Sequence, residues 1–420
     1  MSEKPETRIP LTAPWIERDE ILKVKEILES GNLSTGHQVE QLEREIAEYV
    51  GCKHAVCVSS CTAALHLASI VAKIGPGDEV IVPAFTFPGA AQIPHLLGAK
   101  TVFADCEYSS YTISPAEAEK AVTEKTRAIM PVSAFGLPYD LEQIRALADK
   151  HNLTVIGDNA GAFGSKYEDL RLGAADCDLH MADGTNKKDK EGHVIRGKAE
   201  DLSCFSFHPT KVLTSGEGGC VCTENSDWAV QMRMLRDHGS IRRDDPEPKR
   251  RFVTIGFNYR MSDVHAALGR VQLAKINEMI MRRREAAGIY TEMLEELNPS
   301  PTIGSFKSPV GNIPLPEKKY NIITPYETTG AFHTYQRYVI YLTYHDGISV
   351  RRQLREKGIE ATFGYYNAAD EPFAERLGIY KRCPITRKLF RHTVALPLYH
   401  TISKEDQEHV VNTLKSILKL

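Results

Sequence analysis

One lysine of this chain stands in surroundings that suit covalent chemistry. Lys211 lies in the stretch FSFHPTKVLTSGEGG, which runs from Phe205 to Gly219 and places the lysine between a short apolar run and a glycine-rich turn. A lysine on a solvated surface needs no such surroundings. A lysine that must meet a carbonyl group as a neutral amine needs a confined pocket that disfavours its charge. We therefore interpret Lys211 as a catalytic amine.

A carboxylate suited to work with this lysine ends an earlier apolar run. Asp158 closes the stretch LTVIGD. Taken alone, Asp158 could be a helix cap and Lys211 a buried ion-pair lysine. Together they are the two fixed points that pyridoxal phosphate needs, because a lysine forms the Schiff base with this cofactor and an aspartate keeps its pyridine nitrogen protonated. The pair predicts a pyridoxal phosphate enzyme with Lys211 and Asp158 as catalytic residues.

Other side chains could hold the phosphate and the ring of this cofactor. Ser60 and Thr62, in SSCTAAL, stand between an expected strand and the start of a helix, where free backbone N–H groups and hydroxyls bind phosphate. Ser206 supplies another hydroxyl shortly before Lys211. Phe87, in PAFTFPG, follows a strand end, where an aromatic ring could stack on the cofactor or simply fill the core.

The elements that must position these residues follow an alternating pattern. Strand-like runs at 54–60, 79–85, 101–105, 126–136 and 153–158 alternate with helical runs at 61–75, 89–99 and 141–152. This alternation predicts an α/β domain around a mainly parallel sheet, with ligands beyond the carboxyl ends of the strands. We place this large domain at 1–285 and a smaller α+β domain at 286–420. A polar insertion at 174–200 could be a surface loop or a lid over the site.

Composition excludes several other classes of protein. The net charge is -3, so no basic surplus favours nucleic acid, and no apolar run is long enough to cross a membrane. The nine cysteines include no C-x-x-C pair, so we expect no metal site. Scattered cysteines behind an N-terminus without an apolar signal core favour a cytoplasmic protein.

Six stretches of the chain carry a resemblance to one known family. They are SSCTAALHLA, GDEVIVPAFTFPGAA, GDNAGAFGSKY, FSFHPTKVLTSGEGGCVCT, LRDHG and GFNYRMSDVHAALGRVQL. With these stretches the chain resembles the sugar aminotransferases of the DegT/DnrJ/EryC1/StrS family, which belong to the fold type I pyridoxal phosphate enzymes. The resemblance covers most of the chain from about Pro10 to Arg284 and implies a seven-stranded type of sheet between helices.

The resemblance implies a role for each cofactor residue. Lys211 would bond the cofactor and shuttle protons, Asp158 would pair with the pyridine nitrogen, and Phe87 would stack on the ring. The phosphate would be held by Ser60, Cys61, Thr62 and Ser206.

The resemblance also implies contacts with a partner and with substrates. Asn258, in GFNYRMSD, would reach the phosphate of a neighbouring subunit, which predicts a homodimer with shared active sites. Arg260, His208 and Tyr365 are the candidates for contacts with substrate. The implied reaction transfers an amino group from L-glutamate to a keto sugar, which we expect to be nucleotide-linked.

Departures from the family pattern leave alternatives open. The family has glycine where this chain has Cys61, glutamate where it has Gly157, and glutamine or histidine where it has Gly161. A sugar dehydratase of the same family carries histidine in place of Lys211. Another fold type I enzyme acting on a non-nucleotide ketone, or a desulfurase using Cys177, is a further alternative, and so is a non-catalytic sensor or scaffold.

Overall fold

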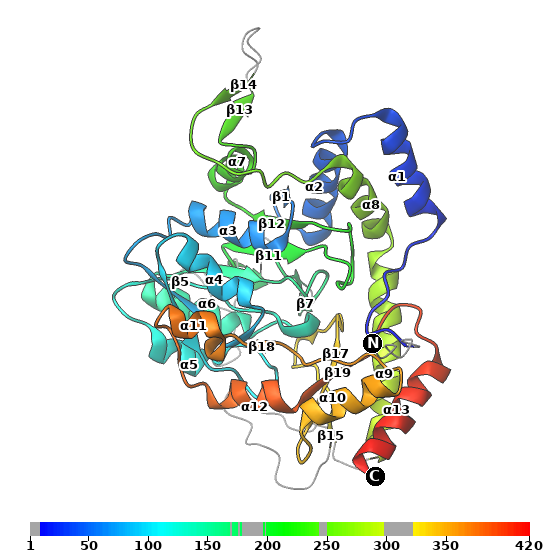
Figure 1. Cartoon of the computed structure of the whole chain (residues 1–420). Helices are drawn as coiled ribbons and strands as arrows, with labels where there is room; N and C mark the ends of the chain where they lie inside the picture. The colour runs from blue at the N-terminus through cyan, green and yellow to red at the C-terminus, as the bar shows by residue number, and fades with distance from the viewer. Residues whose placement is uncertain are drawn as a thin grey trace.

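A seven-stranded sheet forms the centre of the molecule (Figure 1). The computed structural model describes residues 9–168, 170–174, 177–178, 196–197, 199–242, 250–297 and 322–420. In the sheet only β12 runs antiparallel to its neighbours. The strand order is β1 (His54–Val58), β12 (Gly219–Thr223), β11 (Leu202–Ser206), β6 (Thr154–Asp158), β5 (Thr126–Ile129), β2 (Glu79–Pro83) and β4 (Lys100–Ala104).

Helices cover both faces of this sheet, because successive strand residues point to opposite sides and both sides are apolar. In β1, for example, Ala55 and Cys57 enter one core cluster, and Val56 and Val58 enter the other. The first cluster packs against α2 (His37–Val50), α5 (Pro115–Ala121), α6 (Leu141–His151) and α8 (Asp263–Ala274). The second packs against α3 (Cys61–Val71), α4 (Pro88–Leu96) and α7 (Ser226–Leu235). The predicted α/β fold class is confirmed.

The strand expected over 126–136 is shorter in the structure. It ends as β5 at Ile129. Pro131 has no N–H group to donate to a neighbouring strand, although its carbonyl accepts the Asp158 N–H at 2.9 Å. The chain then turns through Phe135, whose φ of 57° lies in the left-handed region.

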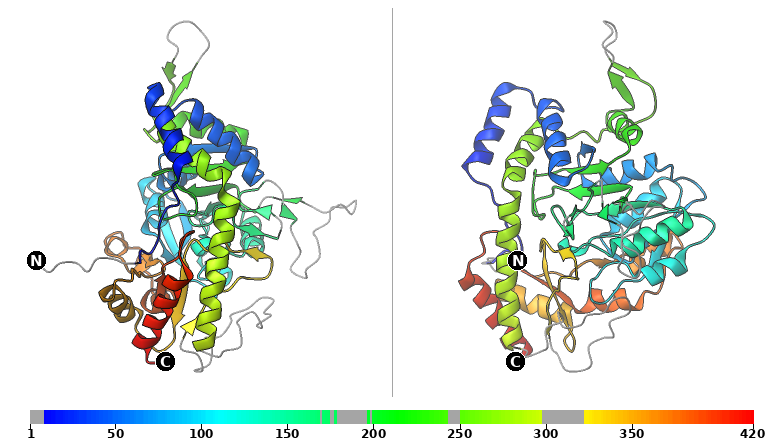
Figure 2. Two further views of the ribbon diagram at one scale, coloured as in Figure 1. Left: turned by 90° about the vertical axis from the view of Figure 1, so that its right-hand side faces the viewer. Right: turned by 180° about the vertical axis from the view of Figure 1, so that it is seen from behind.

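A second core lies in the C-terminal part of the chain. Its antiparallel sheet consists of β15 (Ile322–Ile323), β17 (Tyr338–Leu342) and β19 (Thr393–Leu396), packed against α10 (Gly347–Glu356), α12 (Pro384–His392) and α13 (Lys404–Leu418). Helix α9 (Ile276–Leu297) runs from the first core to the second (Figure 2). The predicted boundary at 285/286 falls inside α9 and stays a prediction. Ile9, near the N-terminus, also packs in the second core.

Short strand pairings join the two parts of the chain next to the expected site. β18 (Tyr366–Asn367) pairs with β3 (Phe85–Thr86), directly before Phe87. β16 (Ala331–Phe332) pairs with β7 (Lys166–Tyr167), which also pairs with β8 (Leu170–Arg171). Both pairings bring C-terminal residues to the loops that follow the strands of the central sheet.

The structure describes only part of the predicted insertion. Most of the insertion predicted at 174–200, including the greater part of the expected loop or lid, lies outside the described residues. Within it, β9 (Cys177–Asp178) pairs with β10 (Arg196–Gly197). The remaining elements are α1 (Arg18–Ser30), α11 (Pro372–Arg376) and the hairpin of β13 (Ser240–Arg242) with β14 (Arg250–Phe252). Among the described helices, none combines the length and the apolarity that crossing a bilayer requires.

Candidate active site

The predicted catalytic residues meet where parallel strands end. Asp158 is the last residue of β6, and Ser206 is the last residue of the adjacent β11. Lys211 follows five positions later in the loop to β12, where its N–H donates to the His208 carbonyl at 2.9 Å. Because the carboxyl ends of parallel strands share one edge of the sheet, these side chains are brought to one place.

Asp158 is a buried carboxylate with capacity for a ligand. Its side chain accepts one hydrogen bond within the described residues, from the Ala160 N–H at 3.2 Å. Burial raises the pKa of Asp158 to about 6, against the opposing effects of that hydrogen bond and of the Lys211 charge. The carboxylate is therefore mostly ionised at pH 7 and can accept a hydrogen bond from a pyridinium nitrogen.

Lys211 is prepared to act as a neutral amine. Burial lowers its pKa to about 8, and the positive charge of Arg337 acts in the same direction, whereas Cys61 and Asp158 oppose it. Part of the lysine side chain is nevertheless accessible to solvent. At pH 7 a lysine with this pKa is neutral about 10 % of the time, against less than about 0.1 % for an ordinary lysine.

The amino end of α3 supplies the predicted phosphate site. Ser60 caps the helix, and its Oγ accepts the Ala63 N–H at 3.1 Å. Gly219 allows this end to approach β12, because a Cβ there would lie 2.6 Å from the Cys61 nitrogen. The Cys61 side chain is buried, whereas Thr62 is exposed beside the helix terminus. The free N–H groups of the first turn and the Thr62 hydroxyl can therefore meet an anion.

Phe87 lies beside this helix end with its ring open to solvent. The ring is 59 % exposed and makes an edge contact with Tyr366, at 6.2 Å between centroids. A Cβ on Gly89 would lie 3.3 Å from the Phe87 ring and 3.6 Å from the Thr62 hydroxyl, so the two side chains converge there. An exposed aromatic face beside an anion-binding helix end fits a phosphorylated heterocycle.

The remaining predicted residues are placed at differing distances from this centre. Tyr365 stacks on Phe135 at 4.5 Å, and its hydroxyl lies 3.5 Å from where a Cβ on Gly161 would be. Burial raises the pKa of Tyr365 to about 12, and the Asp158 charge adds to this effect. His208 is exposed, and its Nδ1 lies 2.9 Å from the Thr210 hydroxyl. The substrate roles of both residues stay predictions.

Asn258 and Arg260 lie on a segment next to the phosphate loop. The Ser59 N–H donates to the carbonyl of the intervening Tyr259 at 2.8 Å. The Asn258 side chain is exposed, whereas Arg260 is held by Asp237, with 2.6 Å between its Nη1 and the Asp237 Oδ1. This ion pair engages the guanidinium that we considered for a contact with substrate, and the roles of both residues stay predictions.

Sequence reasoning missed a buried carboxylate directly behind the site. Glu200 accepts hydrogen bonds from the Tyr139 hydroxyl at 2.6 Å, from the Asn159 amide at 2.9 Å and from the Ser203 hydroxyl. Burial raises the pKa of Glu200, and these three donors oppose that effect. Gly157 provides the room, since a Cβ there would come within 2.5 Å of the Glu200 Cδ. The glycine in place of the glutamate usual in the family was the available signal.

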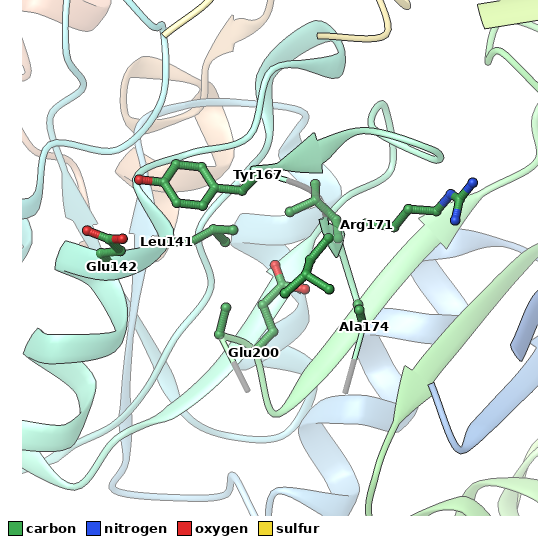
Figure 3. A pocket seen from close by; sticks show the side chains of 10 residues that line it. Leu141, Glu142, Tyr167, Arg171, Ala174 and Glu200 are labelled. Carbon is green, nitrogen blue, oxygen red and sulfur yellow. The ribbon is translucent and has the colours of Figure 1, made fainter. Parts of the chain in front are cut away.

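Glu200 also lines a pocket (Figure 3). Leu141 and Tyr167 form other parts of its wall. Gly157 faces Glu200, and consecutive residues of a strand point to opposite sides of a sheet. The pocket is therefore separate from the cofactor site, and the Glu200 network supports the Asp158 loop from behind.

A stability measurement can test this packing. Gly157→Ala should lower the free energy of unfolding by about 1–3 kcal/mol or more, because the new methyl group overlaps the Glu200 carboxylate. Gly288→Ala, in α9 with no atom within 4 Å of the new Cβ, should be neutral or stabilising by up to about 1 kcal/mol. Urea unfolding of both variants provides the comparison, and equal midpoints would contradict the proposed overlap.

Comparison with known proteins places this site in a family. The family described as the DegT/DnrJ/EryC1/StrS aminotransferase family matches residues 14–415. The chain belongs to this family. It is 31 % identical to the spore coat polysaccharide biosynthesis protein SpsC of Bacillus subtilis, over 98 % of this chain and 97 % of that protein. It is 33 % identical to a pleiotropic regulatory protein of Geobacillus stearothermophilus, over 94 % of each chain.

A solved structure shares the fold of this chain. S. venezuelae DesV, solved in complex with a ketimine intermediate, matches with a TM-score of 0.80 and 26 % identity. The match covers 98 % of this chain and 99 % of DesV. Our chain is therefore a pyridoxal phosphate-dependent aminotransferase of fold type I. The geometry agrees with this cofactor, since an ionised buried aspartate, a lysine of lowered pKa and an open aromatic face surround one helix terminus.

Proposed function

We propose that this aminotransferase moves the amino group of L-glutamate to a keto sugar that is linked to a nucleotide. The main support is the position of Lys211, whose pKa is lowered to about 8, in the loop after β11, next to the strand that ends with the buried Asp158. The similarity to SpsC, whose name places it in polysaccharide biosynthesis, favours a sugar over a simpler ketone. The presence of lysine at position 211 disfavours the dehydratase alternative.

The residues of this chain have defined parts in that reaction. Bound pyridoxal phosphate would supply an electron sink for negative charge at the donor's α-carbon. Lys211, as a neutral amine, takes the proton from that carbon through its Nζ and later returns it. Asp158 accepts a hydrogen bond from the pyridine nitrogen and keeps that nitrogen protonated. The first turn of α3, with Thr62 and Ser206, holds the phosphate.

The two half-reactions can be measured separately. L-Glutamate should convert the loaded enzyme completely to its amine-carrying form, which is followed by visible absorbance. Nucleotide-linked keto sugars should then reverse this change at kcat/KM values at least about tenfold above those of the free sugars, because the nucleotide supplies extra binding energy. Reversal by simple 2-oxo acids but by no keto sugar would refute the sugar proposal. Equal kcat/KM values with free and nucleotide-linked sugars would refute the proposal that the substrate carries a nucleotide.

Exposed apolar side chains support the homodimer. Phe252, Val253 and Ile255 are 66 %, 53 % and 87 % exposed, next to Asn258. Ile21 and Leu28 of α1 are also more than half exposed. Both regions lie at the same end of the molecule in all three views (Figures 1 and 2). Apolar surface of this kind in a soluble enzyme fits a second copy of the chain, and in such a dimer Asn258 would serve the neighbouring site.

Subunit mixing tests this shared site. Asn258→Ala and Lys211→Ala homodimers should each be weakly active or inactive at limiting cofactor, because every site lacks one of the two residues. Exchange between them should produce hybrids with one intact site and restore up to about a quarter of wild-type activity. The proposal would be refuted if ultracentrifugation showed that a fully active species is a monomer. It would also be refuted if activity did not recover in mixtures whose subunit exchange had been verified by mass spectrometry.

A further inference from the structure

Arg337 is a partly buried cation for which no acidic partner exists among the described residues. It directly precedes β17, and its Nη1 donates to the Gly364 carbonyl at 3.0 Å. Its Nε is buried without a hydrogen-bond acceptor, and its Nη2 makes no hydrogen bond to the described residues. Two other arginines with partly buried side chains contrast with it, because Arg260 and Arg284 are each paired with a carboxylate. A cation enclosed without an anion is costly unless a ligand supplies one.

The neighbours of Arg337 connect it to the catalytic centre on two sides. The preceding residue, Gln336, is buried, and its Nε2 donates to the carbonyl of Thr210 at 2.7 Å, directly before Lys211. Gly364, the partner of Nη1, directly precedes Tyr365. The Tyr365 hydroxyl lies 3.5 Å from the position that a Cβ on Gly161 would take, in the loop after Asp158. The charge of Arg337 is also close enough to Lys211 to lower its pKa.

The chemistry of an amino donor explains why a free cation would be useful there. The donor's nitrogen must reach the cofactor carbon to which Lys211 would be bonded. It would therefore take the place of the Lys211 Nζ. In an α-amino acid the carboxylate is attached to the carbon that carries this nitrogen, so it also comes to lie beside Lys211. The Nε–Nη2 edge of Arg337 presents two parallel N–H donors, which is the arrangement that binds a carboxylate in a bidentate manner.

We propose that Arg337 binds the α-carboxylate of the amino donor through its Nε and Nη2 atoms. This assignment rests on the proposed function, in which an α-amino acid reacts at Lys211. It places the donor's carboxylate on a residue of the C-terminal part of the same chain, and not on Arg260, whose guanidinium is held by Asp237. Arg337 thereby selects α-amino acids over amines that lack this carboxylate.

Two donors that differ only in this carboxylate provide the test. L-Glutamate and 4-aminobutyrate share the amine and the distal carboxylate, and only glutamate has the α-carboxylate. In the wild-type enzyme, kcat/KM should favour glutamate strongly. In Arg337→Gln the ratio of the two kcat/KM values should fall about 100-fold, since a bidentate charged contact is lost. Arg337→Lys keeps the positive charge but loses the two parallel N–H donors, so it should give an intermediate ratio.

A binding measurement separates recognition from turnover. Calorimetric titration of the loaded enzyme with 2-methylglutamate, which has no α-proton to lose, should show a Kd about 100-fold weaker in Arg337→Gln than in the wild type. Arg352→Gln, on an arginine whose side chain is 70 % exposed in α10, serves as the matched control and should keep the wild-type Kd and ratio. Cofactor content and urea midpoint verify that each variant is folded.

The outcomes distinguish the two proposals. A donor ratio and a Kd in Arg337→Gln within about threefold of the wild-type values would overturn the Arg337 assignment and leave glutamate transamination intact. Equal losses with both donors, at an unchanged ratio, would also overturn it, since they indicate a structural role. A wild-type enzyme that neither binds 2-methylglutamate nor reacts with L-glutamate would instead refute the proposed donor, and the Arg337 assignment with it.

Discussion

Lys211→Ala should abolish transamination, with a fall in kcat of at least about 10⁴-fold. In the proposed mechanism the variant loses both the amine that would bond the cofactor and the base that would move the donor's proton, and a positioned general base alone contributes about 10²–10⁴-fold. Mass spectrometry after borohydride reduction gives a second measurement, because reduction fixes the lysine–cofactor bond. The wild type should carry the added mass on the peptide that contains Lys211, and the variant should carry none there.

The pH dependence and a surface control make this prediction specific. The neutral amine is the reactive form, so the rate of cofactor capture by the wild-type apoenzyme should rise with pH through about 8 and level off above it. An ordinary lysine would still gain reactivity above pH 9. Lys357→Ala, on an exposed lysine at the end of α10, should behave as the wild type does. Near-normal turnover in Lys211→Ala would show that another residue is the catalytic amine.

Asp158→Asn should retain the cofactor but lose most of the activity. The amide preserves the shape of the side chain and removes the negative charge that we propose keeps the pyridine nitrogen protonated. Loss of such a buried charged contact costs about 2–5 kcal/mol, which corresponds to a fall in rate of roughly 30- to 5,000-fold. Single-turnover kinetics with L-glutamate, together with the absorbance of bound cofactor, measure the two effects independently.

A matched aspartate excludes a general effect of lost charge. Asp227, exposed in the first turn of α7, has the same side chain away from the site, and Asp227→Asn should leave the single-turnover rate unchanged. If Asp158→Asn reacted as fast as the wild type, Asp158 would not be the partner of the pyridine nitrogen. If the variant failed to bind cofactor, the contact of Asp158 with the pyridine nitrogen would be essential for cofactor binding and not only for the rate.

Local sequence determined the central sheet and most of the candidate cofactor site. Alternating apolar runs with glycine and serine at their ends specify strand, turn and helix within a few residues, so that α3 begins where Ser60 predicts it. In parallel sheets the carboxyl ends of the strands share one edge. The position of Asp158 at a strand end therefore followed from its place in the chain, without knowledge of distant contacts.

Contacts between distant segments were decided only by the tertiary structure. Glu200 fills the room beside Gly157 from 43 positions along the chain, and no local pattern links the two. The ion pair of Arg260 with Asp237, and the lack of a hydrogen-bond acceptor for the Arg337 Nε among the residues that the structure describes, are likewise properties of packing. In the sequence Arg260 stands in NYRMSD and Arg337 in TYQRYVI, and neither stretch shows which guanidinium is paired with an acid. Burial and neighbouring charge determine which of them is free to bind a ligand, and these arise only when the two parts of the chain come together.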